Sequence, residues 1–248
     1  MARSFASALV GAVLISPFSS AIALAADADD FSDFPEVPEV ERFDAAFRAA
    51  GGYIGVRGGA VFAEETDVLL NTTTRIDNAY ERALSGAAFI GFEIPDLYHG
   101  IGFRLELEFG QSRLDVETHT VGGTLIAEAD SFGETISTFG FANAYVDLAI
   151  PGTSGALRPF VGGGIGLART VFDNHGVTGS LGVLHDANTS WAWQVMGGAG
   201  LDVTSQITLE AMVRHQAMMD IDLVSTTGQV STTDLTATQV LLGARLRF

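Results

Sequence analysis

The chain of 248 residues contains no cysteine and no lysine, so all 13 of its basic residues are arginine. The absence of cysteine excludes disulfide bonds, thiolate metal sites and thiol nucleophiles. The net charge of −17 argues against a nucleic-acid partner, because such partners require a basic surface. No segment beyond the N-terminal leader approaches 18 uninterrupted apolar residues, so we expect no membrane-spanning helix.

The mean hydropathy is nevertheless above zero, at +0.29. This value is unusual for a soluble protein that lacks a transmembrane helix. It is expected when apolar residues are spread over alternating strands that face lipid.

The N-terminal 50 residues form two segments. Arg3, a short apolar run over 8–15 and the Ala23-Leu24-Ala25 sequence predict a signal peptide over 1–25. Residues 26–50 are rich in acidic residues and include Pro35 and Pro38, so we expect a poorly ordered periplasmic linker.

Residues 51–248 show repeated period-2 alternation of apolar and polar residues, the pattern of strands with one apolar face. In the clearest strand, Leu105 and Leu107 alternate with Arg104, Glu106 and Glu108. The predicted strands cover about 52–63, 84–94, 101–114, 135–148, 158–169, 190–203, 206–217 and 237–248.

The connections between these strands alternate between short and long. Short turns are expected at 95–100, 149–157 and 204–205. Long polar loops are expected at 64–83, 115–134, 170–189 and 218–233. This alternation is typical of an outer-membrane β-barrel, and it predicts an all-β fold: an eight-stranded antiparallel up-and-down transmembrane barrel with four long extracellular loops.

The polar face of the strands is expected to line the lumen. A soluble barrel of the lipocalin kind would turn its apolar face inward instead. Three features favour the membrane barrel: a polar face made of small residues, arginine and carboxylates, charges on that face that nearly balance, and aromatic residues near the strand ends. The predicted lumen charge network consists of Arg57, Glu93, Arg104, Glu106, Glu108, Asp147, Asp202, Glu210, Arg214, Arg245 and Arg247. Because eight strands enclose an interior that side chains can fill, we expect a plugged lumen.

The last strand carries an apolar stripe that ends on an aromatic residue. The stripe resembles the C-terminal signal that the barrel-assembly machinery reads in bacterial outer-membrane proteins. Its residues are Val240, Leu242, Ala244, Leu246 and Phe248.

Four motifs and the Phe248 ending resemble the opacity-type outer-membrane β-barrel family. The motifs are GYIGVRGG over 52–59, FANAYVD over 141–147, PFVGGGIG over 159–166 and WAWQ over 191–194. The resemblance implies an integral outer-membrane protein with a structural, surface-antigen or adhesin-like role, and a narrow porin is the alternative. It also implies contact with outer-membrane lipid and lipopolysaccharide, and a host or surface ligand bound by the loops.

No catalytic residue, cofactor or resident metal is expected. The late-strand His215 lacks the serine that a lipid A deacylase places two residues later. A divalent-metal site built from Asp173, His175, His185 and Asp186 is a minor alternative. The glycines over 162–166 do not match a dinucleotide-binding motif, and we expect them to make room for neighbouring Phe and Tyr side chains. Separately, replacing a lumen glycine with alanine is expected to be far milder than replacing Leu105 with Arg on the lipid face.

Overall fold

The computed structural model describes residues 49–69, 74–81, 83–150, 156–179, 184–225 and 228–248. The predicted signal peptide and most of the predicted linker lie outside the described residues. Among the described residues, no helix is long and apolar enough to cross a membrane.

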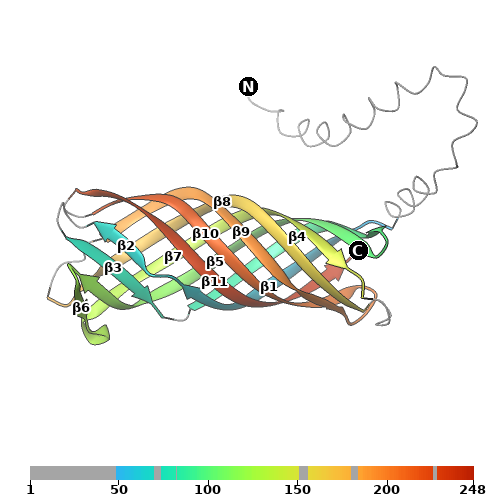
Figure 1. Cartoon of the computed structure of the whole chain (residues 1–248), viewed down its shortest axis with the longest axis horizontal. Helices are drawn as coiled ribbons and strands as arrows, with labels where there is room; N and C mark the ends of the chain where they lie inside the picture. The colour runs from blue at the N-terminus through green and yellow to red at the C-terminus, as the bar shows by residue number, and fades with distance from the viewer. Residues whose placement is uncertain (1–48, 70–73, 82, 151–155, 180–183, 226–227) are drawn as a thin grey trace, which may run out of the picture. The chain divides into compact units, whose positions relative to one another are not determined.

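Eight long antiparallel strands close into a barrel (Figure 1). Each pairs with its neighbour in the ring, and β1 pairs with β11 from Tyr53↔Arg247 to Ala63↔Ala237, which closes the sheet. The predicted eight-stranded topology is confirmed. In ring order the strands are β1 (Gly51–Ala63), β4 (Ala83–Tyr98), β5 (Ile101–Val121), β7 (Ser131–Leu148), β8 (Leu157–Val177), β9 (Leu184–Asp202), β10 (Ile207–Val224) and β11 (Val230–Arg247).

Short elements extend the wall at one end of the barrel. β2 (Thr66–Leu69) pairs with β3 (Arg75–Tyr80), and β3 pairs with β5 beyond the end of β4. β6 (Thr124–Ile126) folds back onto β5, and a short 3-10 helix, η1 (Glu128–Asp130), precedes β7. We call this end the distal end, and the end that holds Gly51 and Arg247 the terminal end.

The strands are longer than a bilayer requires. β5 has 21 residues, about 70 Å along the strand and about 50 Å in height at a tilt near 40°. Outer-membrane barrels present an apolar band only about 25 Å tall. Half of the barrel therefore projects beyond the band.

In the terminal half, the apolar residues face outward as predicted. Leu107, Ile165 and Leu242 are exposed by 63%, 66% and 68%, whereas Arg104 on the inner face is 1% exposed. The alternation predicts Ile90, Phe92 and Ile94 on the outward face of their strand, but Ile94 is buried, and it lies at an irregularity in the β4–β5 register.

In the distal half, the two faces exchange character. On β11 the outward residues change from Val240 to Thr238 and Asp234, and the inward residues change from Arg245 to Ala237 and Leu235. The inward residues of this half form a distal core: Val61, Val68, Ala83, Leu114, Phe139, Phe141, Ala168, Phe172, Ala192, Met218, Ile221, Leu223, Leu235 and Ala237.

This exchange corrects the prediction of long loops. Large parts of the segments 115–134, 170–189 and 218–233 belong to β5, β7, β8, β9, β10 and β11, and 64–83 contains β2 and β3. The polar residues that suggested loops are mostly the outward half of an alternation, and the inward half combines apolar side chains with buried Ser, Thr and His.

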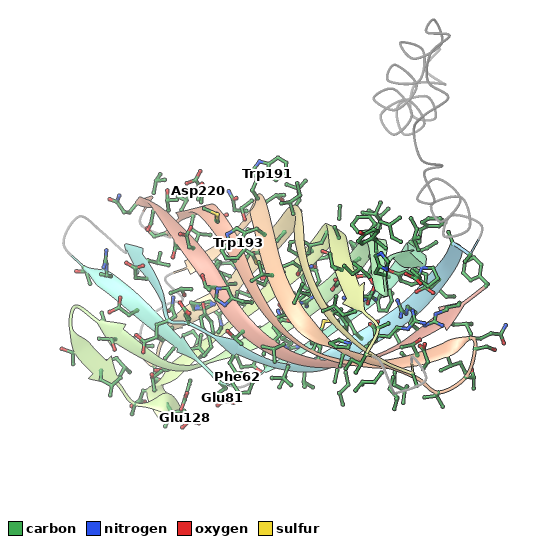
Figure 2. All side chains as sticks on the ribbon, turned by 45° about the vertical axis from the view of Figure 1, so that its right-hand side comes forward. Phe62, Glu81, Glu128, Trp191, Trp193 and Asp220 are labelled. Atoms are coloured by element: carbon green, nitrogen blue, oxygen red, sulfur yellow. The ribbon has the colours of Figure 1, made fainter. Side chains whose placement is uncertain are left out.

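Aromatic residues mark the boundary between the two halves on the outer surface. Phe62, Phe109 and Trp191 are the last large apolar outward residues of their strands, and all three are exposed. Figure 2 labels Phe62, Trp191 and Trp193 on the wall of the barrel. Aromatic residues at this position match the interfacial girdle of membrane barrels.

Candidate functional site

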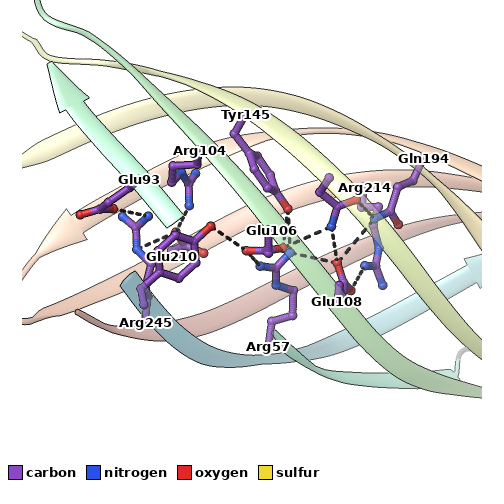
Figure 3. A network of polar contacts seen from close by, with 12 residues as sticks. Arg57, Glu93, Arg104, Glu106, Glu108, Tyr145, Gln194, Glu210, Arg214 and Arg245 are labelled. Carbon is purple, nitrogen blue, oxygen red and sulfur yellow. Dashed lines mark hydrogen bonds and ion pairs between the residues drawn. The ribbon is translucent and has the colours of Figure 1, made fainter. Parts of the chain in front are cut away.

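The lumen of the terminal half contains a network of buried ions (Figure 3). Glu108 on β5 lies at its centre. One carboxylate oxygen of Glu108 pairs with Nη1 of Arg214 on β10, and the other lies 3.2 Å from Nη1 of Arg57 on β1. Asn143 on β7 donates to Glu108 at 3.0 Å. Side chains from four strands therefore meet at one carboxylate in the middle of the barrel.

Glu106 forms a second centre one step towards the terminal end. It accepts from Arg57 Nη2 at 2.7 Å and from the Tyr145 hydroxyl at 2.9 Å. The Tyr53 hydroxyl donates to the same carboxylate at 3.4 Å. Because Glu106 and Glu108 lie two residues apart on one strand, both point inward.

Nearer the terminal end, Arg104 bridges two carboxylates. Its Nε lies 2.7 Å from Asp147 on β7, and its Nη1 lies 2.8 Å from Glu210 on β10. Arg245 on β11 approaches both Glu210 and Glu93. Ion pairs at this level again join strands on different sides of the lumen.

The last level lies close to the terminal opening. Arg247 pairs with Glu93 at 2.7 Å and with Asp202 at 2.6 Å, and Arg158 lies 3.4 Å from the other oxygen of Asp202. The side chains of Arg247 and Asp202 are 18% and 16% exposed, whereas those of Arg57 and Glu106 are almost fully buried. Water therefore reaches this level more readily than the centre.

The structure brings all eleven residues of the predicted charge network into the lumen, each with an ion pair. Sequence reasoning missed the neutral partners and one cation. These residues alternate in the sequence with the outward apolar residues, and this position on the inward face could have identified them. The missed members are Tyr53, Asn143, Tyr145, Arg158, Gln194 and Gln239.

Aromatic rings fill the space between the ions. The Arg57 guanidinium lies 3.9 Å from the centre of the Phe89 ring, and Arg104 lies 4.5 Å from that of Tyr145. Arg214 lies 5.3 Å from that of Phe139. Such cation–π contacts stabilise a guanidinium away from water.

Glycines on the neighbouring strands make room for aromatic rings, as predicted for the glycines over 162–166. A Cβ at Gly110 would lie 2.7 Å from the Phe139 ring, and one at Gly166 would lie 2.8 Å from the Phe141 ring. Phe139 and Phe141 fall on the polar face of their strand by sequence, and the structure explains them, since both rings belong to the distal core.

Several polar atoms of the network have no hydrogen-bond partner among the described residues. They include Arg57 Nε, Arg104 Nη2, Glu210 Oε2 and Arg214 Nε. Buried polar atoms of this kind are normally satisfied by water. The packing therefore favours a lumen that holds individual water molecules between its ions.

A smaller polar cluster lies inside the distal half. His175 Nε2 lies 3.1 Å from the Thr135 hydroxyl, and the Tyr80 hydroxyl lies 2.8 Å from that of Thr66. The His119 and His175 rings are 6.0 Å apart, and both residues are at most 1% exposed. Burial lowers the pKa of His175 to about 4, so this imidazole is neutral at pH 7.

The structure separates the residues of the suggested metal site. His175 points into the distal half, whereas the exposed His185 pairs with Asp173 at 2.8 Å. Asp186 accepts from the backbone N–H of Val224 at 2.7 Å. Within the described part of the chain, no three His, Asp or Glu side chains are grouped closely enough to hold a metal ion.

His215 lies at the boundary of the apolar band, beside Thr238 on β11. Its Nδ1 lies 3.3 Å from the Thr238 hydroxyl, and its ring lies 5.7 Å from that of Trp193. Neither Gln216 nor Ala217 offers it a nucleophile. The side chain thus has the surroundings of an interfacial residue.

Comparisons with known proteins agree with this architecture. The family described as "Outer membrane protein beta-barrel domain" matches residues 38–248, which confirms the resemblance seen in the sequence. No curated protein matches the chain.

Among solved structures, Neisserial surface protein A is similar at 17% identity with a TM-score of 0.48, over 80% of this chain and 99% of that chain. OprG from Pseudomonas aeruginosa is similar at 16% identity with a TM-score of 0.42, over 80% and 96%. Ail, the attachment invasion locus protein of Yersinia pestis, is similar at 11% identity with a TM-score of 0.41, over 80% and 99%.

Proposed function

The chain belongs to the outer membrane protein beta-barrel family and is an integral outer-membrane protein, and we propose that it is a non-enzymatic barrel that displays its distal half outside the cell. The observation that carries this proposal is that side chains fill the interior of both halves of the barrel. Ion pairs cross the lumen in the terminal half, and the distal half is filled by the apolar core together with buried polar side chains such as His119 and Thr135. A barrel filled at both levels is suited to anchoring and presenting a surface.

The lengths of the connections support this orientation. β4 and β5 are joined by only His99 and Gly100, and β9 and β10 are joined by 203–206. Outer-membrane barrels place their short turns in the periplasm. The distal end would then face outward, and the boundary ring of Phe62, Phe109 and Trp191 would lie at the outer-leaflet headgroups.

The distal surface is strongly acidic. Arg75, Arg113 and Arg169 are its exposed basic residues among those described. Its exposed carboxylates are Glu64, Glu65, Glu81, Asp115, Glu117, Glu128, Asp130, Asp220, Asp222 and Asp234. A surface of this charge would attract a cationic host or surface ligand, which supports the adhesin-like role.

Labelling of intact cells tests the orientation, and the absence of native cysteine makes the readout clean. Glu81→Cys and Glu128→Cys place thiols at the distal end, and Ser205→Cys places one in a terminal-end turn. We expect a membrane-impermeant maleimide to label the first two in intact cells and Ser205→Cys only after permeabilisation. The reverse pattern would overturn the proposal.

A narrow porin is the second candidate, and the unpartnered polar atoms of the lumen favour it. Water molecules next to Arg57 Nε and Arg104 Nη2 would provide a path for small solutes. Planar-bilayer recordings separate the two functions. A closed lumen gives no reproducible conductance steps, whereas steps that disappear in Arg104→Ala would establish the porin.

We further propose that the stripe from Val240 to Phe248 is recognised during assembly. The Phe248 ring is 72% exposed and lies against Gly52, and the Phe248 backbone N–H donates to the Gly52 carbonyl at 3.0 Å. Replacing Phe248 with Ala should lower the amount of folded barrel in the membrane while leaving refolding in detergent intact. Equal assembly of both proteins would count against recognition of this residue.

A further inference from the structure

A groove runs along the outer wall of the barrel at the top of the apolar band. Its volume is about 710 Å³, and it lies over β5, β7, β8 and β9. Phe109 and Leu107 form one side, and Leu167 and Trp191 form the other. Its flanking side chains point away from the lumen, and Glu108 is the one member of the ion network among the residues that line it.

The groove arises from small residues on β7. The register places Gly140 between Phe109 and Leu167, and it places Ala142 between Leu107 and Ile165. Large side chains therefore flank a floor of one glycine and one alanine in two successive rows. A Cβ at Gly140 would meet no atom closer than 3.8 Å, so this floor is open on its outer side.

A cation lies at the distal end of the groove. Arg169 is the next outward residue after Leu167 on β8, and the register places it between Thr138 and Thr189. The Arg169 side chain is exposed and makes no hydrogen bond or ion pair with another described residue. By contrast, the exposed Arg113 pairs with Glu134 at 2.6 Å.

We propose that this groove binds lipid A, a phosphorylated and multiply acylated glycolipid, with one acyl chain between Phe109 and Leu167 and a phosphate on Arg169. The inference rests on the proposed orientation, because only then does Arg169 reach the outer-leaflet headgroups. An unpaired guanidinium beside apolar surface suits a phosphate, since a charge-assisted hydrogen bond is stronger where water is scarce. The hydroxyls of Thr138 and Thr189 add donors beside it.

Native mass spectrometry of the purified full-length protein in detergent, titrated with lipid A, tests the site. We expect one lipid A to be retained in preference to phosphatidylcholine. Arg169→Ala should weaken retention about tenfold, and Arg169→Lys should weaken it less. Gly140→Leu should fill the groove and weaken retention to a similar degree.

Two matched variants separate this site from general lipid contact. Arg113→Ala removes a nearby exposed guanidinium that is already paired, and Gly197→Leu fills an outward glycine position on β9 outside the groove. Both should retain lipid A like the unmodified protein. For dephosphorylated lipid A, Arg169→Ala should make no difference.

Equal retention by all variants, once each is shown to be folded, would overturn the proposal and leave only an unspecific lipid shell. This outcome would not affect the orientation, which the cysteine-labelling experiment decides independently.

Discussion

Arg214 on β10 and Glu108 on β5 form an ion pair across the barrel, although their strands are not neighbours in the ring. Neither side chain has measurable solvent exposure. The pair thus connects opposite walls through the lumen, and Arg57 joins it from a third strand. Removing any one of these ions leaves the others charged and buried.

Replacing Glu108 with Ala should therefore destabilise the barrel by about 3–5 kcal/mol, the cost of leaving a buried charge without its partner. Urea unfolding of the protein refolded into lipid vesicles measures this change. Asp115→Asn on the same strand is the control, because Asp115 is exposed on the outer face. A change below about 0.5 kcal/mol, the scale of ordinary surface substitutions, would contradict a structural role for the network.

Because the apolar face points towards lipid, the cost of an outward arginine should depend strongly on its depth in the membrane. Replacing Leu105 with Arg, in the apolar band, should cost about 2–4 kcal/mol, whereas Gln111→Arg above the boundary should cost about 0–1 kcal/mol. Both residues point outward on β5. The same unfolding assay compares them, and equal costs would refute the placement of the boundary between Phe109 and Gln111.

The surroundings of two glycines on β8 predict that one position tolerates alanine and the other does not. Gly166 faces the lumen, and a Cβ there would collide with the Phe141 ring and the Gly140 carbonyl. Gly163 faces outward, and its nearest neighbour would be the Gln194 carbonyl at 3.5 Å. Gly166→Ala should thus destabilise the barrel by about 1–3 kcal/mol through overpacking, and Gly163→Ala should leave the unfolding midpoint nearly unchanged.

This prediction revises an expectation from the sequence, namely that alanine at a lumen glycine costs far less than a charge on the lipid face. The alternating pattern shows that a glycine faces the lumen but not which ring fills the space above it. If Gly166→Ala hardly changed the free energy of unfolding, the original expectation of a low cost would stand.

The buried His175 predicts a loss of distal stability in acid. Because the pKa is lowered from its ordinary value of 6.5 to about 4 in the folded protein, the unfolded chain binds more protons between these values. The stabilising contribution is complete above pH 6.5 and falls as the pH drops towards 4, by up to about 3 kcal/mol. The neighbouring His119 adds repulsion if both rings are charged.

Hydrogen exchange of β8 at pH 7 and pH 4.5 measures this loss. Protection of the segment around Thr135 and His175 should fall in acid and should fall less in His175→Gln. His185→Gln, on the exposed surface, should behave like the unmodified protein. Equal acid sensitivity of His175→Gln and the unmodified protein would show that another group titrates.

The sequence predicted the ring of eight strands and the direction of their faces, because alternation is a local property. Arg104, Glu106 and Glu108 alternate with Leu105 and Leu107 whatever their partners are. The cross-lumen partners could not be predicted, since the contact of Glu108 with Arg214 depends on tilt and register. The distal parts of the strands were predicted as loops for a related reason. Thr238, Asp234 and other polar outward residues have the composition of loops.

The exchange of faces also fixes the immersion depth of the protein. Sinking by one row, about 5 Å at the usual tilt, would move Gln111, Arg169 and Thr238 into the acyl chains. Rising by one row would lift Phe109 and Trp191 into water. The barrel therefore has a single preferred vertical position, and a membrane of different thickness would have to adjust to the protein.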